Sequence, residues 1–210
     1  MQTNSILRRP FRFRFFNATL YLIAANVLIF ALGYVWPMVT YALALSPQAV
    51  MAGWVWQVFT YMFAHANLTH LLVNMLGLFF FGTPVERTLG SLEFLLYYLL
   101  SGTFAGIASF AIYAFSGAWN TMLLGASGAV FALLLAFGVL YPKAMVYLYG
   151  IIPIRAPLMV IGYTAIEIVF TLLGAASSVA HLTHLAGFVA GAAYFPVRLG
   201  MNPFKRLRER

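Results

Sequence analysis

The sequence predicts an all-α membrane protein, a bundle of six transmembrane helices with a long interfacial first loop. Of its 210 residues, 63% are hydrophobic and only 8% are charged, and the mean hydropathy is +0.92. A soluble domain of this length would have too little polar material to cover its surface. Six apolar runs match the thickness of about 30 Å of hydrocarbon at 1.5 Å per residue. They are Ala18–Trp36, His70–Val85, Phe94–Phe115, Gly125–Tyr141, Ala156–Gly174 and Val179–Phe195.

The first apolar run also has some features of a secretory signal peptide. Basic residues at Arg8–Arg14 precede it, and Ala42-Leu43-Ala44 resembles a cleavage site. However, the run is longer than the roughly 7–15 apolar residues that are usual in a signal peptide. We therefore expect it to be retained as the first transmembrane helix.

The placement of charge predicts which side of the membrane each loop occupies. With six spans both termini share one side, and all twelve Lys and Arg residues fall there. The opposite-side segments Pro37–Thr69, Ser116–Leu124 and Ala175–Ser178 carry no formal charge. By the positive-inside rule we expect both termini in the cytoplasm of a bacterium whose inner membrane holds the protein. The cationic residues are Arg8, Arg9, Arg12, Arg14, Arg87, Lys143, Arg155, Arg198, Lys205, Arg206, Arg208 and Arg210.

The same pattern divides the chain and excludes one class of partner. We expect a basic N-terminal segment at 1–17, a six-helix domain at 18–197 and a basic tail at 198–210. The net charge of +8 does not indicate a nucleic-acid partner, because no basic patch is interleaved with aromatic residues. The chain has no cysteine, which excludes disulfides and thiolate metal sites.

The long outer segment Pro37–Thr69 is predicted to lie in the membrane interface. It is uncharged and rich in aromatic residues, whereas a solvated loop would be more polar. We expect Trp54 and Trp56 at the level of the lipid headgroups.

The unusual polar residues of the second, fourth and sixth helices fall at one depth near the outer face. His70 and Asn74 begin the second helix and share one face of it, Ser127 begins the fourth, and His184 lies in the first turns of the sixth. A hydroxyl and an imidazole are costly in hydrocarbon without partners. We therefore interpret Ser127 as a nucleophile and His184 as its base, with His181 in an interfacial or supporting role.

Glycines flank both candidate residues. His184, Gly187 and Gly191 lie on one stripe of the sixth helix, and Gly125 and Gly128 surround Ser127. Small residues let membrane helices approach closely, which a Ser–His hydrogen bond of about 2.6–3.2 Å requires.

A third member of the catalytic group is not expected. The chain has no aspartate, and its glutamates are Glu86, Glu93, Glu167 and Glu209. Of these only Glu167 lies within a span on the relevant side, and near the middle of the fifth helix it is predicted to be several ångströms too deep. We therefore expect a Ser–His dyad without metal or cofactor. The oxyanion donors at that depth are His70, Asn74 and the backbone N–H of Ser127, and such stabilisation is often the largest catalytic contribution.

Other classes of function remain open from the residues alone. A haem or metal protein could use histidine ligands, although a zincin-type HExxH motif is absent and no carboxylate is expected at the depth of the histidines. A transporter would need an inverted repeat and broken helices at the midplane. An inactive scaffold of the same fold is a further alternative. The four histidines are His65, His70, His181 and His184.

Four motifs resemble, in order and spacing, those of the rhomboid intramembrane serine proteases. They are Trp56…His65-Ala-Asn-Leu-Thr-His70-Leu-Leu-Val-Asn74, Gly82…Glu86-Arg87…Gly90, Gly125-Ala-Ser127-Gly128 and His184-Leu-Ala-Gly187…Gly191. The resemblance covers about residues 18–197. It implies an intramembrane serine endopeptidase that cleaves single-span or polytopic membrane proteins within the lipid bilayer.

The resemblance also implies roles for individual residues. Ser127 would be the nucleophile and His184 the general base, with His70 and Asn74 in the oxyanion hole. Structural and loop roles are implied for His65, Trp56, Glu86 and Arg87. The fifth helix and the loop after it are similar to the gate and cap through which substrates enter. Two positions depart from the family pattern, Gln57 and Tyr61, and both concern the anchoring of the first loop.

Overall fold

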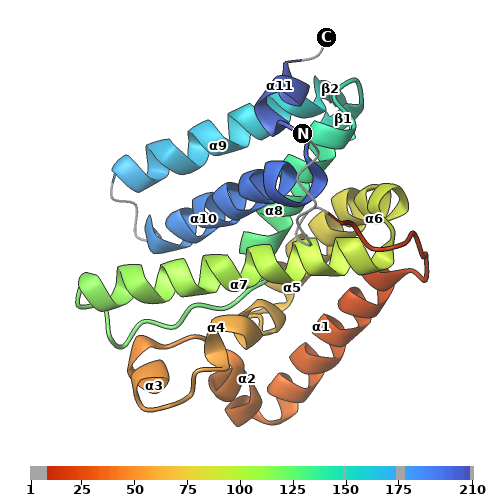
Figure 1. Ribbon diagram of the computed structural model, residues 1–210. Helices are drawn as coiled ribbons and strands as arrows, with labels where there is room; N and C mark the ends of the chain where they lie inside the picture. The colour runs from red at the N-terminus through yellow and green to blue at the C-terminus, as the bar shows by residue number, and fades with distance from the viewer. Residues whose placement is uncertain (1–8, 149, 174–177, 209–210) are drawn as a thin grey trace.

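The protein is a bundle of helices of very different lengths (Figure 1). The computed structural model describes residues 9–148, 150–173 and 178–208. The helices are α1 Ala18–Val35, α2 Pro37–Leu43, α3 Pro47–Met51, α4 Gln57–Thr60, α5 Leu68–Gly77, α6 Thr83–Leu89, α7 Ser91–Phe115, α8 Ser127–Leu140, α9 Ala156–Leu172, α10 Ser178–Tyr194 and α11 Pro203–Leu207, and the strands are β1 Met145–Leu148 and β2 Ile152–Arg155.

Each of the six predicted apolar runs overlaps a described helical stretch, and Gly174, at the end of the fifth run, lies outside the described residues. Within the described ranges, three helical stretches are long and apolar enough to cross a membrane: Ala18–Val35, Ser91–Phe115 and Leu68–Leu89, which joins α5 to α6 through a π-helical turn. The helices α8 and α9 are apolar but shorter. Arg8, Arg210 and most of the predicted Ala175–Ser178 turn lie outside the described residues.

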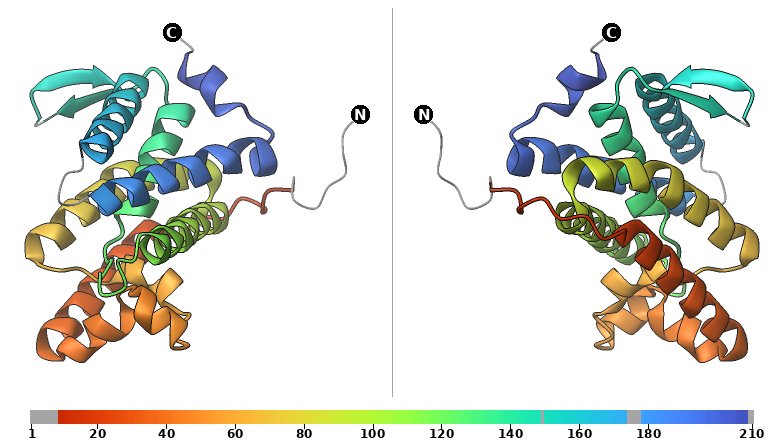
Figure 2. Two further views of the ribbon diagram at one scale, coloured as in Figure 1. Left: turned by 90° about the vertical axis from the view of Figure 1, so that its left-hand side faces the viewer. Right: turned by 90° about the vertical axis from the view of Figure 1, so that its right-hand side faces the viewer.

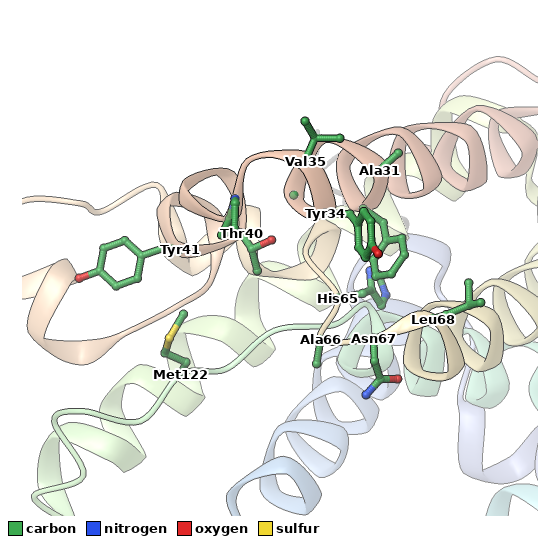
Figure 3. Close-up of a pocket in the computed structure, with 13 residues that line it drawn as sticks. Ala31, Tyr34, Val35, Thr40, Tyr41, His65, Ala66, Asn67, Leu68 and Met122 are labelled. Carbon is green, nitrogen blue, oxygen red and sulfur yellow. The ribbon is translucent and has the colours of Figure 1, made fainter.

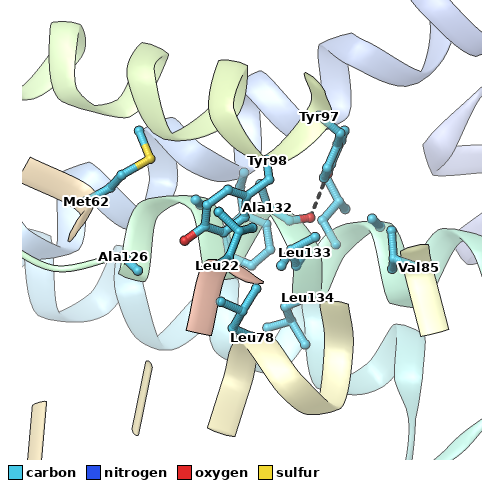
Figure 4. Close-up of a cluster of buried hydrophobic side chains, with 14 of the residues drawn as sticks. Leu22, Met62, Leu78, Val85, Tyr97, Tyr98, Ala126, Ala132, Leu133 and Leu134 are labelled. Carbon is cyan, nitrogen blue, oxygen red and sulfur yellow. Dashed lines mark hydrogen bonds between the residues drawn. The ribbon is translucent and has the colours of Figure 1, made fainter. Parts of the chain in front are cut away.

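The core of the molecule is built around α8. Buried residues occur on all sides of this helix, as expected for a helix that is apolar all round. Figure 4 shows Ala132, Leu133 and Leu134 of α8 packed among side chains from the neighbouring helices. The Tyr97 hydroxyl of α7 donates a 2.6 Å hydrogen bond to the carbonyl of Ala132, so the one polar group of that side chain is satisfied inside the core.

Helix α10 packs against α7, α8 and α9, and its glycines set how close it comes. A Cβ atom at Gly187 would lie 2.0 Å from the carbonyl oxygen of Gly128 on α8. A Cβ atom at Gly191 would lie 2.4 Å from the Tyr97 hydroxyl. The backbones of α8 and α10 are therefore in contact near the start of α8, and a side chain at Gly187 would prevent this contact.

Buried carboxylates fasten the N-terminal segment to the bundle. The carboxylate of Glu86 accepts hydrogen bonds from the backbone N–H groups of Ala18 and Thr19, at 2.6 and 2.9 Å, and from the hydroxyls of Thr19 and Ser91. Glu86 thus caps the first turn of α1, where the N–H groups have no partner within the helix. The neighbouring Arg87 is exposed.

A second carboxylate, Glu93, joins the N-terminal segment to the end of α10. It accepts hydrogen bonds from the backbone N–H of Phe11 at 3.0 Å and from the Arg198 guanidinium at 2.8 Å. The Tyr194 hydroxyl also donates to it. A buried carboxylate is tolerated here because a cation and several donors surround it.

The connection between α8 and α9 contains an antiparallel hairpin that the sequence interpretation did not anticipate. Strand β1 pairs with β2 in the register Met145↔Arg155 and Val146↔Ile154. Gly150 has φ +73°, a conformation that favours glycine and permits the tight reversal. Figure 2 shows the hairpin and α11 at one end of the molecule, with α2 and α3 at the opposite end.

The segment between α1 and α5 is folded into short helices and held by a buried amide. Gln57 is fully buried. Its Oε1 accepts a 3.0 Å hydrogen bond from the N–H of Ser46, and its Nε2 donates to the carbonyls of Tyr41 and Ala42 at 3.2 and 3.3 Å. The departure from the family pattern at this position therefore leaves the loop well anchored.

Candidate active site

The first-loop segment positions the chain just before α8. The N–H of Gly125 donates a 3.0 Å hydrogen bond to the carbonyl of Tyr61, and Leu45 and Leu123 exchange two backbone hydrogen bonds of 2.8 Å. Gly125 has φ +117°, which favours glycine. Tyr61 is itself fixed, because its buried hydroxyl donates a 2.8 Å hydrogen bond to the carbonyl of Gly102. These contacts hold Ser127 at the first position of α8.

Ser127 and His184 are in direct contact. The Ser127 Oγ lies 2.7 Å from the His184 Nε2, which is hydrogen-bond distance for a nucleophile and its base. The close approach depends on the glycine contact between α8 and α10, because Gly128 and Gly187 are adjacent in sequence to this pair or one turn away from it. For Nε2 to accept the serine proton, the neutral ring must carry its hydrogen on Nδ1.

An aromatic ring fixes the plane of the His184 imidazole. Phe131, one turn along α8 from Ser127, stacks on it with a centroid separation of 4.2 Å and an interplanar angle of 7°. Tyr163 and Phe188 in turn contact the edge or face of Phe131 at 6.1 and 5.4 Å. The sequence interpretation missed Phe131, since one phenylalanine among twenty carries no distinguishing signal.

The expectation that Glu167 lies too deep to reach His184 is wrong. The Glu167 Oε1 lies 3.1 Å from the His184 Nδ1. Glu167 lies five residues before the last residue of α9, Leu172, and His184 lies six residues after the first residue of α10, Ser178. At 1.5 Å per residue both positions are therefore about 7–9 Å from those helix ends, and the prediction failed because it placed His184 at a shallower level than Glu167. A dyad without any acid is therefore not the arrangement in the structure.

His181 contacts the other oxygen of the same carboxylate. Its Nδ1 lies 2.5 Å from the Glu167 Oε2, and its ring stacks on Phe170 at 5.3 Å. The contact of His184 with Glu167 is less well aligned, since its Nδ1 forms no hydrogen bond of good angular geometry. Catalytic hydrogen bonds are often poorly aligned in a free enzyme and tighten when substrate binds.

The same three residues correct a second expectation, that no carboxylate lies at the depth of the histidines. The potential ligand atoms of Glu167, His181 and His184 all lie within 4.8 Å of one another. Two ligands of a tetrahedral zinc ion, at about 2.0–2.1 Å from the metal, would be separated by about 3.3 Å. The 2.5 Å separation of His181 and Glu167 is instead that of two atoms sharing a proton, so the cluster has the geometry of a hydrogen-bonded group.

His70 lies beside the segment that leads to Ser127. A Cβ atom at Gly125 would come within 2.6 Å of the His70 Cε1 and Nε2 atoms, so the imidazole edge rests directly on that glycine. Asn67 caps α5 by accepting a 2.8 Å hydrogen bond from the N–H of His70. Asn74 is buried and donates one amide hydrogen to the carbonyl of His70 at 2.9 Å, which leaves its second amide hydrogen for another acceptor.

His65 and Trp56 belong to the first-loop segment. The His65 ring meets the His70 ring at 5.2 Å and 69°, and burial, together with the nearby His70, lowers the pKa of His65 to about 4. Trp56 donates a 2.9 Å hydrogen bond from its indole to the carbonyl of Ala42 and stacks on Trp54. Figure 3 shows His65 beside Tyr34 in a pocket of about 1030 Å³ between α1, α2 and the start of α5.

Comparisons with known proteins point to one family. A family model described as a rhomboid domain matches residues 52–200. "RHOMBOID-like protein 12, mitochondrial" of Arabidopsis thaliana is 34% identical over 157 residues, covering 68% of this chain and 46% of that protein. "Rhomboid protease GluP" of Bacillus subtilis (strain 168) is 35% identical over 130 residues, covering 60% of this chain and 23% of that protein.

A third similar protein comes from an animal. "Presenilin-associated rhomboid-like protein A, mitochondrial" of Danio rerio is 31% identical over 136 residues, covering 63% of this chain and 34% of that protein. The chain thus spans less than half the length of each of these three relatives.

Proposed function

The chain belongs to the rhomboid family, and we propose that it is an intramembrane serine endopeptidase in which Ser127 is the nucleophile and His184 the general base. The observation that carries this proposal is the 2.7 Å contact between the Ser127 Oγ and the His184 Nε2. Family membership makes proteolysis the expected chemistry, and in this chain both reactive groups are present and in contact.

The contact provides a complete path for the proton. Ser127 attacks the carbonyl carbon of the scissile peptide bond while its proton passes to His184 Nε2, and the carbonyl oxygen takes the electron pair. When the C–N bond breaks, His184 returns the proton to the departing amine and leaves an acyl group on Ser127. Water then attacks the acyl group, His184 accepts its proton, and the carboxylic acid product leaves as the serine is restored.

We assign the oxyanion hole to His70, Asn74 and the backbone N–H of Ser127. The contact of His70 with Gly125 supports this assignment, because it places that imidazole next to the start of α8. Asn74 lies one turn further along α5 and donates to the His70 carbonyl. First-turn N–H groups have no acceptor within their own helix and favour negative charge.

The bilayer is the expected site of the reaction. The protein is a membrane protein, and we propose six crossings by the helices of 18–197, with the basic segments 1–17 and 198–210 both in the cytoplasm. The absence of charge from Pro37–Thr69 and Ser116–Leu124 supports an outer-facing active site. A bacterial inner membrane remains a prediction, since the named relatives include mitochondrial proteins as well as a bacterial one.

The proposed substrates are single-span or polytopic membrane proteins, cleaved in or near a transmembrane segment. A peptide bond within a helix is shielded by its own hydrogen bonds, so segments with small residues or helix breakers near the outer face are the expected cleavage sites. This chain's α9, most of whose residues are exposed, is the proposed side of entry.

Proteolysis in liposomes tests the proposal. Wild-type protein and the Ser127→Ala and His184→Ala variants would be reconstituted with a panel of single-span substrates, and products would be identified by mass spectrometry. Each substitution should lower cleavage by at least about 10³-fold, and the double variant should be no worse than the single ones, because the pair acts as a unit. Wild-type rates in Ser127→Ala would refute the mechanism, and an inactive wild-type protein across the panel would favour a scaffold.

A further inference from the structure

We propose that Glu167 is a positioning residue for His184. Because Glu167 belongs to α9, the orientation of the His184 ring then depends on the position of α9 relative to α10. This inference rests on the proposed function. It assigns a role to a side chain that the Ser127–His184 pair does not itself require, and it connects the active site to α9, a helix most of whose residues are exposed.

The carboxylate lies where the acid of a catalytic triad would lie. With Ser127 on Nε2, the hydrogen of the neutral His184 ring is on Nδ1, and the Glu167 Oε1 is 3.1 Å from that atom. A carboxylate at this place selects the reactive tautomer, fixes the ring and stabilises the imidazolium that forms when the serine proton is transferred. Ser127, His184 and Glu167 are therefore arranged in sequence, as nucleophile, base and orienting acid.

The burial of α9 explains why this carboxylate matters to the helix as well. Its buried residues are Ala156, Pro157, Met159 and Val160 in the first turns, and after them only Glu167, whose residue exposure is 5%. Isoleucine, valine and phenylalanine side chains on the rest of the helix are exposed. Over its outer half, α9 thus contacts α10 through the buried Glu167 carboxylate, which lies against His181 and His184, and through the largely exposed Phe170 ring on His181.

Between these two attachments α9 stands apart from α10. An apolar pocket of about 620 Å³ is lined by Val160, Ile161, Thr164 and Ile168 of α9 and by Leu185 and Phe188 of α10, among others. Glu167 lies at the outer end of this gap. Movement of α9 away from α10 would separate its carboxylate from both imidazoles, and His184 would then lose its partner while keeping its contact with Ser127.

His181 and His184 contact the Glu167 carboxylate in different ways. His181 holds Glu167 at 2.5 Å in a well-aligned contact, whereas the His184 contact is longer and poorly aligned in the free protein. His181 therefore fixes the carboxylate in position, and a small shift of α9 or of the ring is enough to make or break the hydrogen bond to His184.

Removal of the charge at Glu167 tests the positioning role. Glu167→Gln keeps the size of the side chain but cannot stabilise an imidazolium, so kcat should fall by roughly 10²–10⁴-fold with KM changed by less than about threefold. Glu167→Asp should recover part of the activity.

The matched control is Thr164→Val on the same helix. The Thr164 hydroxyl donates a 2.8 Å hydrogen bond to the carbonyl of Val160 on its own helix, so this variant should match the wild-type kcat and KM. If Glu167→Gln has a kcat within threefold of wild type while Ser127→Ala is inactive, the positioning role is overturned and the proposed function stands. If Ser127→Ala is active, the proposed function itself has failed.

A distant wedge tests the dependence on α9. A Cβ atom at Gly138 of α8 would lie 2.7 Å from the Val160 Cγ2 of α9, whereas a Cβ atom at Gly162 would meet nothing within 4 Å. Gly138 is about 16 Å along the helix from Ser127 at 1.5 Å per residue. Gly138→Val should thus displace α9 without touching the site, and Gly162→Val adds the same side chain where it displaces nothing.

The wedge should act through Glu167. Gly138→Val should lower kcat by threefold or more in the wild-type background and have no effect in the Glu167→Gln background, while Gly162→Val should change neither. Thermal melts in detergent would confirm that each variant is folded at the assay temperature. An unchanged kcat in Gly138→Val, or a full additional loss in the double variant, would overturn the dependence on α9.

Discussion

Single residues in this site acquire their roles from what lies within one side chain of them. Ser127 and His184 could be paired from the sequence because each begins a helix at the same face and each is flanked by glycines. Glu167 could not, because the sequence does not show that a position five residues before the end of α9 matches the depth of His184, six residues after the start of α10. Phe131, stacked on His184, had no signal to distinguish it from lipid-facing phenylalanines.

If His70 and Asn74 stabilise the oxyanion, the loss of either side chain should lower the catalytic rate. Asn74→Ala and His70→Ala should lower kcat by roughly 10–10³-fold, the effect of one lost donor, with smaller changes in KM. Asn74→Ala also removes the hydrogen bond to the His70 carbonyl, so thermal melts must accompany the kinetics. A loss of thermal stability that accounts for the whole loss of activity would assign these residues a structural role instead.

At the scale of elements, glycine contacts decide which helices meet. The apolar runs predicted the positions of the long helices well, because a run of apolar residues can be recognised without knowing which other parts of the chain it contacts. The short helices between α1 and α5 were not predicted, because their arrangement depends on partners distant in sequence, such as Leu45 with Leu123. Gln57 is a further example, since the carbonyls that accept its hydrogen bonds lie in an earlier part of the loop. The hairpin β1–β2 pairs residues that are close in sequence, but strands of four residues give little periodic signal.

The close contact between α8 and α10 should not tolerate a larger side chain at Gly187. Gly187→Ala places a Cβ atom 2.0 Å from the Gly128 carbonyl oxygen, so α10 must move away and the Ser127–His184 distance must lengthen. Activity should fall by at least tenfold, and the melting temperature should fall because overpacking costs about 1–3 kcal/mol. Gly162→Ala, at an open position, is the matched control, and equal behaviour of the two variants in both assays would contradict this view of the packing.

Considered as a whole, the molecule holds Ser127 and His184 on two helices in close contact and Glu167 on a more exposed one. Helices α8 and α10 meet through backbone contacts at glycine, whereas the buried residues of α9 are those of its first turns and Glu167. Glu86 and Glu93, which bind the N-terminal segment, belong to α6 and α7. We propose that this arrangement lets a substrate enter beside α9 while the proposed nucleophile and base stay in contact.

We propose that His184 makes Ser127 nucleophilic, and the rate at which a fluorophosphonate labels Ser127 is a direct measure of that reactivity. Reconstituted wild-type protein, Ser127→Ala and His184→Ala would be treated alike, and the modified residue would be mapped by mass spectrometry of the digested protein. We predict one phosphonate adduct, on Ser127, in the wild-type protein and at least about 10²-fold slower labelling in His184→Ala. Labelling of another residue, or labelling of Ser127 at the wild-type rate in His184→Ala, would show that His184 does not activate Ser127.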